Sequence, residues 1–169
     1  SEITASGLPK FRATQIYRWL HKVGVTSFSE MTDLSLSLRE ALDDSFVIFS
    51  CNIEKKLVSE YDSTMKYLFK LHDGEFVESV LMKYKYGYTV CVSSQVGCRM
   101  GCKFCASTLS GVVRNLTASE ILSQIYAIQR DNDIRVSHIV MMGMGEPLDN
   151  YDNVIKFLHL ISDENGLNI

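Results

Sequence analysis

From residue 88 onward the sequence alternates between predicted strands and predicted helices, and this order restricts the fold more than any other feature. Residues 88–94 and 136–142 are predicted to be strands because they are rich in apolar and β-branched residues. Helices are predicted after the capping box Thr117-Ala-Ser-Glu120 and over residues 150–162, and residues 167–169 would begin another strand. This order is typical of a parallel sheet, so the predicted fold class is α/β.

Two loops follow these predicted strands, and each contains an unusual run of residues. The first loop carries three cysteines, and the second contains Gly143-Met-Gly-Glu-Pro147. Ligands bind at the carboxyl ends of the strands in parallel α/β folds, so both loops are candidate ligand sites. A Gly-x-Gly sequence alone more often marks a turn than a site.

The residues before position 88 follow other periods. Ile16, Trp19, Leu20 and Val23 are spaced as one face of a helix that ends at Gly24. Further helices are predicted at 28–33 and 36–46. From Cys51 the period becomes two, which predicts strands at 53–61, 65–71 and 75–84. We therefore expect a helical accessory domain over residues 1–50, a β-hairpin extension over 51–87 and an α/β domain over 88–169.

The cysteines Cys98, Cys102 and Cys105 form a C-x3-C-x2-C run in the first loop. Thiolates are ligands for iron–sulfur clusters, zinc and copper(I). A cubane cluster normally takes four cysteines, so three would leave one iron available to a ligand that is not protein. The alternative is a structural zinc site, which generally has four protein ligands; His138 is the nearby candidate for the fourth.

Charge and composition indicate a soluble protein in a reducing compartment. The net charge is −3 and 46% of the residues are hydrophobic, with no long apolar run and no signal-peptide pattern. Five cysteines are an odd number, which argues against a disulfide framework. Two stretches, residues 3–29 and 79–119, contain basic residues and no acids. Such stretches can bind phosphates, although scattered solvated side chains are the simpler interpretation of the first.

The cysteine run and the residues around it resemble a known family. C-x3-C-x2-C with Phe104 before the last cysteine is similar to the radical S-adenosylmethionine (SAM) enzymes. Within that superfamily, Cys91-Val-Ser-Ser-Gln-Val-Gly-Cys98 and Gly143-Met-Gly-Glu-Pro147 resemble the RlmN/Cfr family, which methylates carbon 2 or carbon 8 of an adenine in RNA. The resemblance begins at Gly7-Leu-Pro-Lys-Phe-Arg-Ala13. It implies a partial (β/α)6 barrel, of which this chain would contain only the N-terminal part.

The resemblance also implies the residues of a cofactor site. Cys98, Cys102 and Cys105 would ligate a [4Fe-4S] cluster whose open iron binds S-adenosylmethionine. Phe104 would shield the cluster and lie near the adenine of the cofactor. Gly145 and Glu146 would bind the methionine amino group of the cofactor.

Cys91 and Glu78 are the candidate catalytic residues. From the sequence alone, an inert buried thiol is the better interpretation of Cys91, and Glu78 is more simply a solvent-facing strand residue. The resemblance implies that Cys91 resolves a covalent protein–RNA intermediate and ends in a disulfide bond, and that Glu78 accepts a proton near the substrate. The second cysteine of that disulfide lies near the C-terminus of family members, and no cysteine follows Cys105 here.

We therefore expect a radical SAM methyltransferase that acts on C2 of an adenine in large-subunit (23S) ribosomal RNA and in transfer RNA through a methyl-cysteine. The alternatives are a C8-directing Cfr-type methylase and a non-catalytic RNA-binding fragment. Expected partners are RNA and an electron donor such as flavodoxin or ferredoxin, with no membrane. The expected protein is a cytoplasmic monomer.

Overall fold

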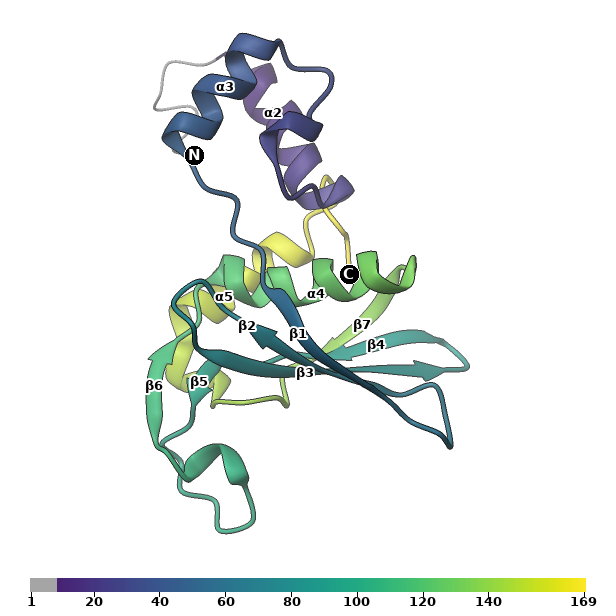
Figure 1. The fold of residues 1–169 in the computed structure, drawn as a ribbon, viewed down its shortest axis with the longest axis vertical. Helices are drawn as coiled ribbons and strands as arrows, with labels where there is room; N and C mark the ends of the chain where they lie inside the picture. Colours follow the sequence, from purple (N-terminus) through teal and green to yellow (C-terminus); the bar gives the residue numbers. More distant parts are fainter. Residues whose placement is uncertain (1–8) are drawn as a thin grey trace. The chain divides into compact units, whose positions relative to one another are not determined.

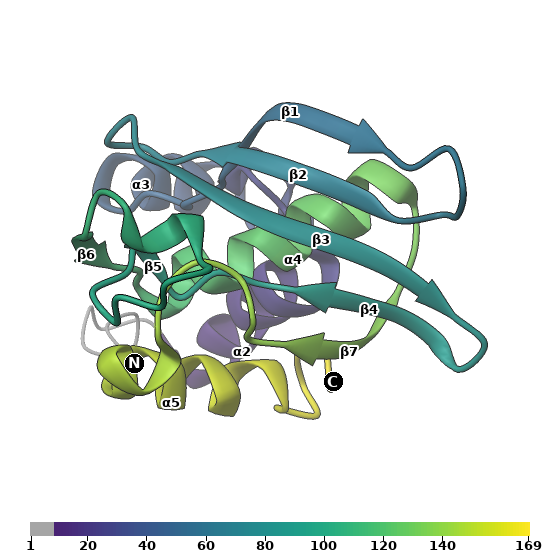
Figure 2. The same cartoon turned by 90° about the horizontal axis from the view of Figure 1, so that it is seen from below.

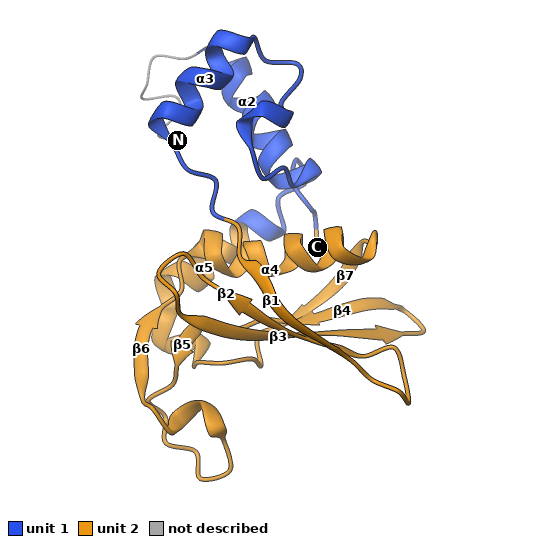
Figure 3. Cartoon of the chain, in the orientation of Figure 1, with its two compact units in different colours: residues 1–49, 160–168 blue, residues 50–159, 169 orange. Residues whose placement is uncertain are grey.

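The structure is a computed structural model that describes residues 9–169. Its internal contacts divide the chain into two compact units, shown in different colours in Figure 3. The first contains residues up to Phe49 and the later segment Leu160–Asn168, and the second contains Ser50–His159. The three-part domain division at residues 50 and 87 stays a prediction.

The first unit is a small helical bundle with its own apolar core. It contains α2 (Lys10–Arg18), which continues as a π-helical turn over Trp19–Val23, and α3 (Leu36–Ser45). Gly24 ends the first helix with a left-handed φ of 76°. The predicted helix at 28–33 is wrong in extent, because only the 3-10 turn Phe28–Glu30 forms, capped by Ser27. The core consists of Ile16, Val25, Phe28, Met31, Leu34 and Leu42.

The segment after α5 (Tyr151–Ile161) contacts α2 within this unit. The hydroxyl of Tyr17 donates a hydrogen bond of 2.9 Å to Asp163. Burial, that hydrogen bond and the nearby negative charge raise the pKa of Tyr17 to about 12. The predicted strand at 167–169 does not form, and these residues lie in a turn and the chain end.

The second unit contains a five-stranded sheet in the order β1-β2-β3-β4-β7 (Figure 2). Neighbouring strands are antiparallel from β1 to β4, whereas β4 and β7 are parallel. The α/β prediction is therefore confirmed. The strands are β1 (Asn52–Val58), β2 (Met65–Lys70), β3 (Phe76–Tyr84), β4 (Gly87–Cys91) and β7 (Val136–Val140).

One face of this sheet packs on α4 (Ala118–Asn132), which lies along it in Figures 1 and 2. Strand residues alternate between faces, and in β2, β3 and β4 most of those that face α4 are buried. Thr117 and Glu120 form the predicted capping box at the start of α4. The buried apolar residues of this layer include Tyr67, Phe69, Val77, Leu81, Val90, Ile121, Ile125 and Ile128.

The opposite face is called here the open face, and the pairing register identifies its residues. Lys66 pairs with Val80, and Val80 pairs with Cys91. Directly paired residues of neighbouring strands point to the same side, so these three form a row across three strands. Glu78 shares the open face because it lies two residues from Val80. The viewer of Figure 2 looks onto this face, with α4 behind the sheet.

A short hairpin beyond β4 was not predicted from the sequence. The predicted strand 88–94 ends at Cys91, and β5 (Gln95–Gly97) pairs instead with β6 (Val112–Asn115). The cysteine loop lies between these two strands and extends away from α4 (Figure 1). Within residues 9–169, no helix is long and apolar enough to span a membrane.

Candidate functional site

The candidate site is formed where the parallel strands β4 and β7 end. The backbone N–H of Val92 donates to Val140 at 2.9 Å, and that of Gly143 donates to Val92 at 3.1 Å. Ser94 donates to the carbonyl of Met144 at 2.8 Å. The segment after β4 and the predicted glycine loop therefore continue alongside each other past the end of the sheet, as expected for loops at a common strand edge.

The glycines of the second loop are required by this close approach. A Cβ on Gly143 would lie 2.7 Å from the Ser93 hydroxyl and from the Val92 carbonyl oxygen. Gly145 has φ of 96°, and a Cβ there would lie 2.6 Å from Cβ of Gln95. Both glycines thus allow tight packing against the segment after β4, whatever else they bind.

Gln95 connects the glycine loop to the residues that follow it. Its side-chain oxygen accepts from the backbone N–H of Glu146 at 2.9 Å. Its side-chain nitrogen donates to Asn115 at 2.8 Å and to Asp149 at 2.9 Å. Gln95 is fully buried, so these three bonds satisfy a polar group that would otherwise be costly to desolvate.

A second buried glutamine, Gln124 on α4, holds the backbone just beyond Cys91. It accepts from the N–H of Ser93 at 2.9 Å and donates to the carbonyl of Ser93 at 3.0 Å. It also accepts from the hydroxyl of Ser79 at 2.6 Å. The hydroxyl of Ser93 donates to the carbonyl of Glu78 at 2.6 Å and accepts from Met144 N–H at 2.9 Å. These bonds join β3, β4, α4 and the glycine loop.

Sequence reasoning missed Gln95 and Gln124. Gln124 had a usable signal, because it lies three residues after Ile121 and four before Ile128, within the apolar stripe of α4. A polar residue at such a position needs buried partners, and those partners identify the strand ends that it holds. Gln95 had no comparable signal, since its partners come from two segments that are distant in the sequence.

Glu146 has a local role in the structure. Its carboxylate accepts from the N–H of Leu148 at 3.1 Å and so caps the 3-10 helix Pro147–Asn150. The capping bond fixes the side chain beside the glycine loop. Binding of a cofactor amino group by Gly145 and Glu146 stays a prediction.

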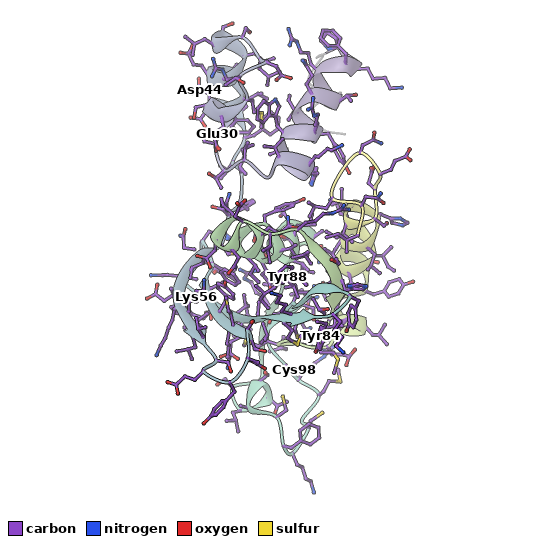
Figure 4. All side chains as sticks on the ribbon, turned by 90° about the vertical axis from the view of Figure 1, so that its right-hand side faces the viewer. Glu30, Asp44, Lys56, Tyr84, Tyr88 and Cys98 are labelled. Atoms are coloured by element: carbon purple, nitrogen blue, oxygen red, sulfur yellow. The ribbon has the colours of Figure 1, made fainter. Side chains whose placement is uncertain are left out.

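The cysteine loop is anchored mainly at its two ends. Cys98 is buried at the end of β5, and its N–H donates to the carbonyl of Gly111 at 3.0 Å (Figure 4 labels Cys98). Gly97 has φ of 73°, and a Cβ there would lie 2.0 Å from the Gly111 carbonyl oxygen. Between these ends most bonds are short-range, such as that from the Thr108 hydroxyl to the Cys105 carbonyl at 2.9 Å, and the exception is the ion pair of Arg99 with Asp149.

The three cysteines share this loop, but they differ in exposure and their thiols are not grouped as a metal site. Cys98 is buried, Cys105 is half-buried and Cys102 is exposed. Among the described residues, no group of three His, Cys, Asp or Glu side chains is arranged to hold a metal ion. The ring of His138, the candidate fourth zinc ligand, instead packs edge-to-face with the ring of Tyr86, with 4.9 Å between the ring centroids. Phe104 is 94% exposed.

The donor set nevertheless fits an iron–sulfur cluster. Three thiols come from one loop, and all five cysteines of the described chain are free. Soft thiolates in this number suit a cluster with one iron left for another ligand. Because the loop has few bonds to the rest of the unit, its cysteines can turn toward a common centre.

Cys91 and Glu78 lie on the open face, next to the ends of the strands. Burial raises the pKa of the Cys91 thiol, and the backbone N–H of Met142 offsets part of this effect. The carboxylate of Glu78 forms an ion pair of 2.8 Å with Lys66. Cys51 is buried and accepts a hydrogen bond of 3.2 Å from the hydroxyl of Ser123.

Two of the basic residues near the loop are paired with carboxylates. Arg114 on β6 donates to Glu120 through two nitrogens, at 2.8 and 2.9 Å, and to Asp73 at 2.6 Å. Arg99 forms an ion pair with Asp149. The acid-free stretch 79–119 is therefore not a continuous basic surface, because acids from other segments neutralise part of it.

Two family models match the chain. One, described as "Ribosomal RNA large subunit methyltransferase N-terminal domain", matches residues 3–48. The other, described as "Radical SAM superfamily", matches residues 92–169. The second match covers the cysteine loop, the glycine loop and α4, which are the parts that form the candidate site.

Curated relatives are similar over nearly the whole chain. The "Probable dual-specificity RNA methyltransferase RlmN" of Clostridium novyi (strain NT) is 56% identical over 160 residues, which are 95% of this chain and 47% of the relative. The protein of the same name from Bacillus velezensis is 51% identical over 170 residues, 99% of this chain and 47% of the relative. The chain thus spans about half the length of the curated relatives it matches.

A solved structure confirms the fold. The crystal structure of a radical SAM methyltransferase from Sphaerobacter thermophilus superposes with a TM-score of 0.91 at 37% sequence identity. The similarity covers 99% of this chain and 50% of that one. The chain therefore belongs to the RlmN/Cfr family of radical SAM proteins, as its cysteine and glycine motifs predict.

Proposed function

We propose that this chain is part of a radical SAM methyltransferase that methylates C2 of an adenine in large-subunit ribosomal RNA and in transfer RNA. The observation that carries the proposal is the arrangement of the two loops. The glycine loop follows β7, and the cysteine loop lies beyond β4, the parallel neighbour of β7, between β5 and β6. Cys91 and Glu78 lie on the open face of the same sheet. The names of the relatives, which are RNA methyltransferases, support an RNA substrate.

Cys98, Cys102 and Cys105 would hold the [4Fe-4S] cluster, and the glycine loop would bind S-adenosylmethionine. Together these groups, when bound, supply the one-electron chemistry that an unactivated aromatic carbon requires. Gly145 allows the backbone to approach the cofactor closely, and the carboxylate of Glu146 accepts hydrogen bonds from its amino group. Phe104, exposed in the structure, would cover the cofactor and exclude water.

Glu78 and Cys91 would act on the RNA. Once the methylene carbon of the second cysteine has bonded to C2 of the adenine, the carboxylate of Glu78 accepts the proton that leaves C2. The electron released with that proton would pass to the cluster that the three loop cysteines would hold. The Cys91 thiolate attacks the sulfur of a second cysteine, which carries a methylene group joined to the base. A disulfide forms as the bond between that sulfur and the methylene carbon breaks. The released carbon keeps the electron pair and takes up a proton, which completes the methyl group.

In the family that this chain resembles, the second cysteine lies near the C-terminus, in a part of the sequence that this chain does not include. The raised pKa of Cys91 keeps its thiol protonated at neutral pH, so its attack requires prior loss of a proton. Reduced flavodoxin or ferredoxin would supply the electron, and the reducing cytoplasm would restore the thiols. The enzyme would act as a monomer.

The proposal is tested by product analysis with the protein expressed from the complete gene. After anaerobic reconstitution with iron and sulfide, the enzyme is incubated with S-adenosylmethionine, a reductant and unmethylated ribosomal or transfer RNA. We expect 2-methyladenosine by mass spectrometry, only a trace of single-turnover product from Glu78→Gln, no product from Cys91→Ala, and normal product from Cys51→Ser. Formation of 8-methyladenosine, or no methylated base despite a loaded cluster, would contradict the proposal.

A further inference from the structure

Lys66 is a charged residue of the open face to which the resemblance assigns no role. Its Nζ lies 2.8 Å from Oε1 of Glu78. Lys66 is on β2, and its direct partner on β3 is Val80, which is in turn the partner of Cys91 on β4. The ammonium, the carboxylate and the thiol therefore share one face over three adjacent strands.

The ion pair contributes little to folding. The side chains of Lys66 and Glu78 are 47% and 43% exposed, and ion pairs this exposed typically add little to the stability of a protein. Among the described residues, Lys66 is the only ion-pair partner of Glu78. The pair fixes Oε1 and leaves Oε2 available as an acceptor, and the carboxyl group then has a defined orientation.

A neighbouring lysine provides the contrast. Lys56 on β1 forms an ion pair of 2.6 Å with Asp131 on the other side of the sheet. Asp131 also accepts from the hydroxyl of Tyr67, at 2.7 Å, and Tyr67 is fully buried in the core. This pair connects β1 to α4 and has a structural role, whereas the pair of Lys66 joins two adjacent strands that the sheet already holds together.

We propose that Lys66 is a positioning residue for Glu78. It holds one carboxylate oxygen so that the other is directed to the proton acceptor position beside Cys91. This inference rests on the proposed function of Glu78 and adds a residue that acts through it. Loss of Lys66 should lower the rate of the chemical step and leave RNA binding unchanged, because orientation affects the reacting geometry more than ground-state binding.

The test is a double-mutant cycle in the protein from the complete gene, with Lys66→Met, Glu78→Gln and the double variant. We expect Lys66→Met to reduce kcat about tenfold with an unchanged KM for RNA. Lys66→Arg should restore most of the activity, because arginine also donates to a carboxylate. In the Glu78→Gln background, Lys66→Met should have no further effect on residual single-turnover product. Lys56→Met is the matched control, which should lower the melting temperature with little effect on kcat.

The possible results separate this inference from the proposed function. If Glu78→Gln abolishes methylation but Lys66→Met stays within twofold of wild type, the inference alone is overturned. The same holds if the Lys66 effect persists undiminished in the Glu78→Gln background, or if Lys56→Met reproduces it. If Glu78→Gln has no effect, the catalytic role proposed for Glu78 fails and the inference fails with it.

Discussion

The two loops that follow β4 and β7 are built in opposite ways. The glycine loop is held by buried side chains from other segments, namely Gln95 and Ser93, and its glycines pack against backbone. The cysteine loop is fixed where it meets β5 and β6, and apart from the ion pair of Arg99 with Asp149 its interior has short-range bonds and exposed side chains such as Phe104. The glycine loop is held by the fold along its length, whereas the cysteine loop is held mainly at its two ends.

This contrast follows from the chemistry of the two proposed ligands. A cofactor that is bound through backbone and one carboxylate needs those groups positioned beforehand, because ordering them on binding would reduce affinity. A metal cluster supplies strong bonds of its own, and metal binding can order a segment that is loose without it. The spacing of the three cysteines in the sequence is therefore enough to specify the proposed cluster site. The glycine loop, in contrast, needs a buried polar network to position its backbone for the proposed cofactor.

The largest effect is expected from the thiols of the cysteine loop. Replacing Cys98, Cys102 or Cys105 by alanine should reduce bound iron from about four per chain to nearly none after anaerobic reconstitution, because each removes one of three protein ligands. Iron analysis and the visible absorption of the cluster measure this loss. Cys51→Ser is the control and should load normally, since Cys51 is buried beside Ser123 in another part of the unit. Stoichiometric zinc in place of iron would contradict the assignment.

Alanine substitutions at two glycines with positive φ, one in each loop, test how tightly the two loops are packed. Gly145→Ala in the glycine loop should cost about 3 kcal/mol, because it combines a strained φ of 96° with a Cβ 2.6 Å from Gln95. In the cysteine loop, Gly101 has a φ of 71°, but a Cβ there would have no atom within 4 Å. Gly101→Ala should therefore lower the free energy of unfolding by only about 1 kcal/mol. Denaturant unfolding of the two variants measures the difference. Equal losses would show that the two loops are packed alike.

The anchoring of the cysteine loop at its ends is tested by Arg114 on β6. Arg114→Met should destabilise the protein by about 2 kcal/mol at neutral pH, because it leaves the carboxylate of Glu120, which is 4% exposed, without its cation. Arg114→Lys should restore only part of the loss, since lysine lacks the two-nitrogen fork. Chemical denaturation of the three proteins measures both values.

The ion pair of Arg114 and Glu120 should also make the free energy of unfolding depend on pH. Burial raises the pKa of Glu120, but hydrogen bonds from Arg114 and Thr117 outweigh it, so the pKa lies below its ordinary value. The unfolded chain therefore takes up protons first as the pH falls. The stabilisation is complete above the ordinary carboxyl pKa and is lost as the pH falls through the lowered value. The difference between wild type and Arg114→Met should shrink over that window, and a constant difference would contradict this explanation.

The smallest expected effect is a difference in alkylation rate between the cysteines outside the loop and those within it. Burial raises the pKa of Cys51 to about 11, with Ser123 and nearby charges as lesser influences, and raises that of Cys91 as well. Alkylation by iodoacetamide at pH 8 should therefore be slower at Cys91 than at the exposed Cys102, and slowest at Cys51. The rate at Cys91 should keep rising above the ordinary thiol pKa. Peptide mass spectrometry over a pH series measures each rate, and equal rates at Cys91 and Cys51 would show that the open face is closed to solvent.

The elements that sequence could predict are those with local signals. The capping box at Thr117 begins α4, Gly24 ends the first helix, and Gly74 gives a turn with φ of 89° between β2 and β3. The α/β order and the two loops at strand ends follow from periodicity and from glycine and cysteine positions. Each of these features depends on residues close together in the chain.

The features that sequence could not predict depend on distant partners. The hairpin of β5 and β6 brings together residues on either side of the cysteine loop, and strands of three and four residues give too short a pattern to detect. The pairing of Arg114 with Asp73 and Glu120 removes charge from a stretch that appears purely basic in sequence. The ion pair of Lys66 and Glu78 depends on strand register, which local periodicity does not fix.

The most direct test of the account is electron paramagnetic resonance of the reconstituted, reduced protein with and without S-adenosylmethionine. If three cysteines hold a cluster with one iron open beside the glycine loop, reduction should give a [4Fe-4S] signal whose shape changes when S-adenosylmethionine is added. A reduced cluster whose signal is unaffected by a saturating concentration of S-adenosylmethionine, or a protein that gives no cluster signal, would contradict the account.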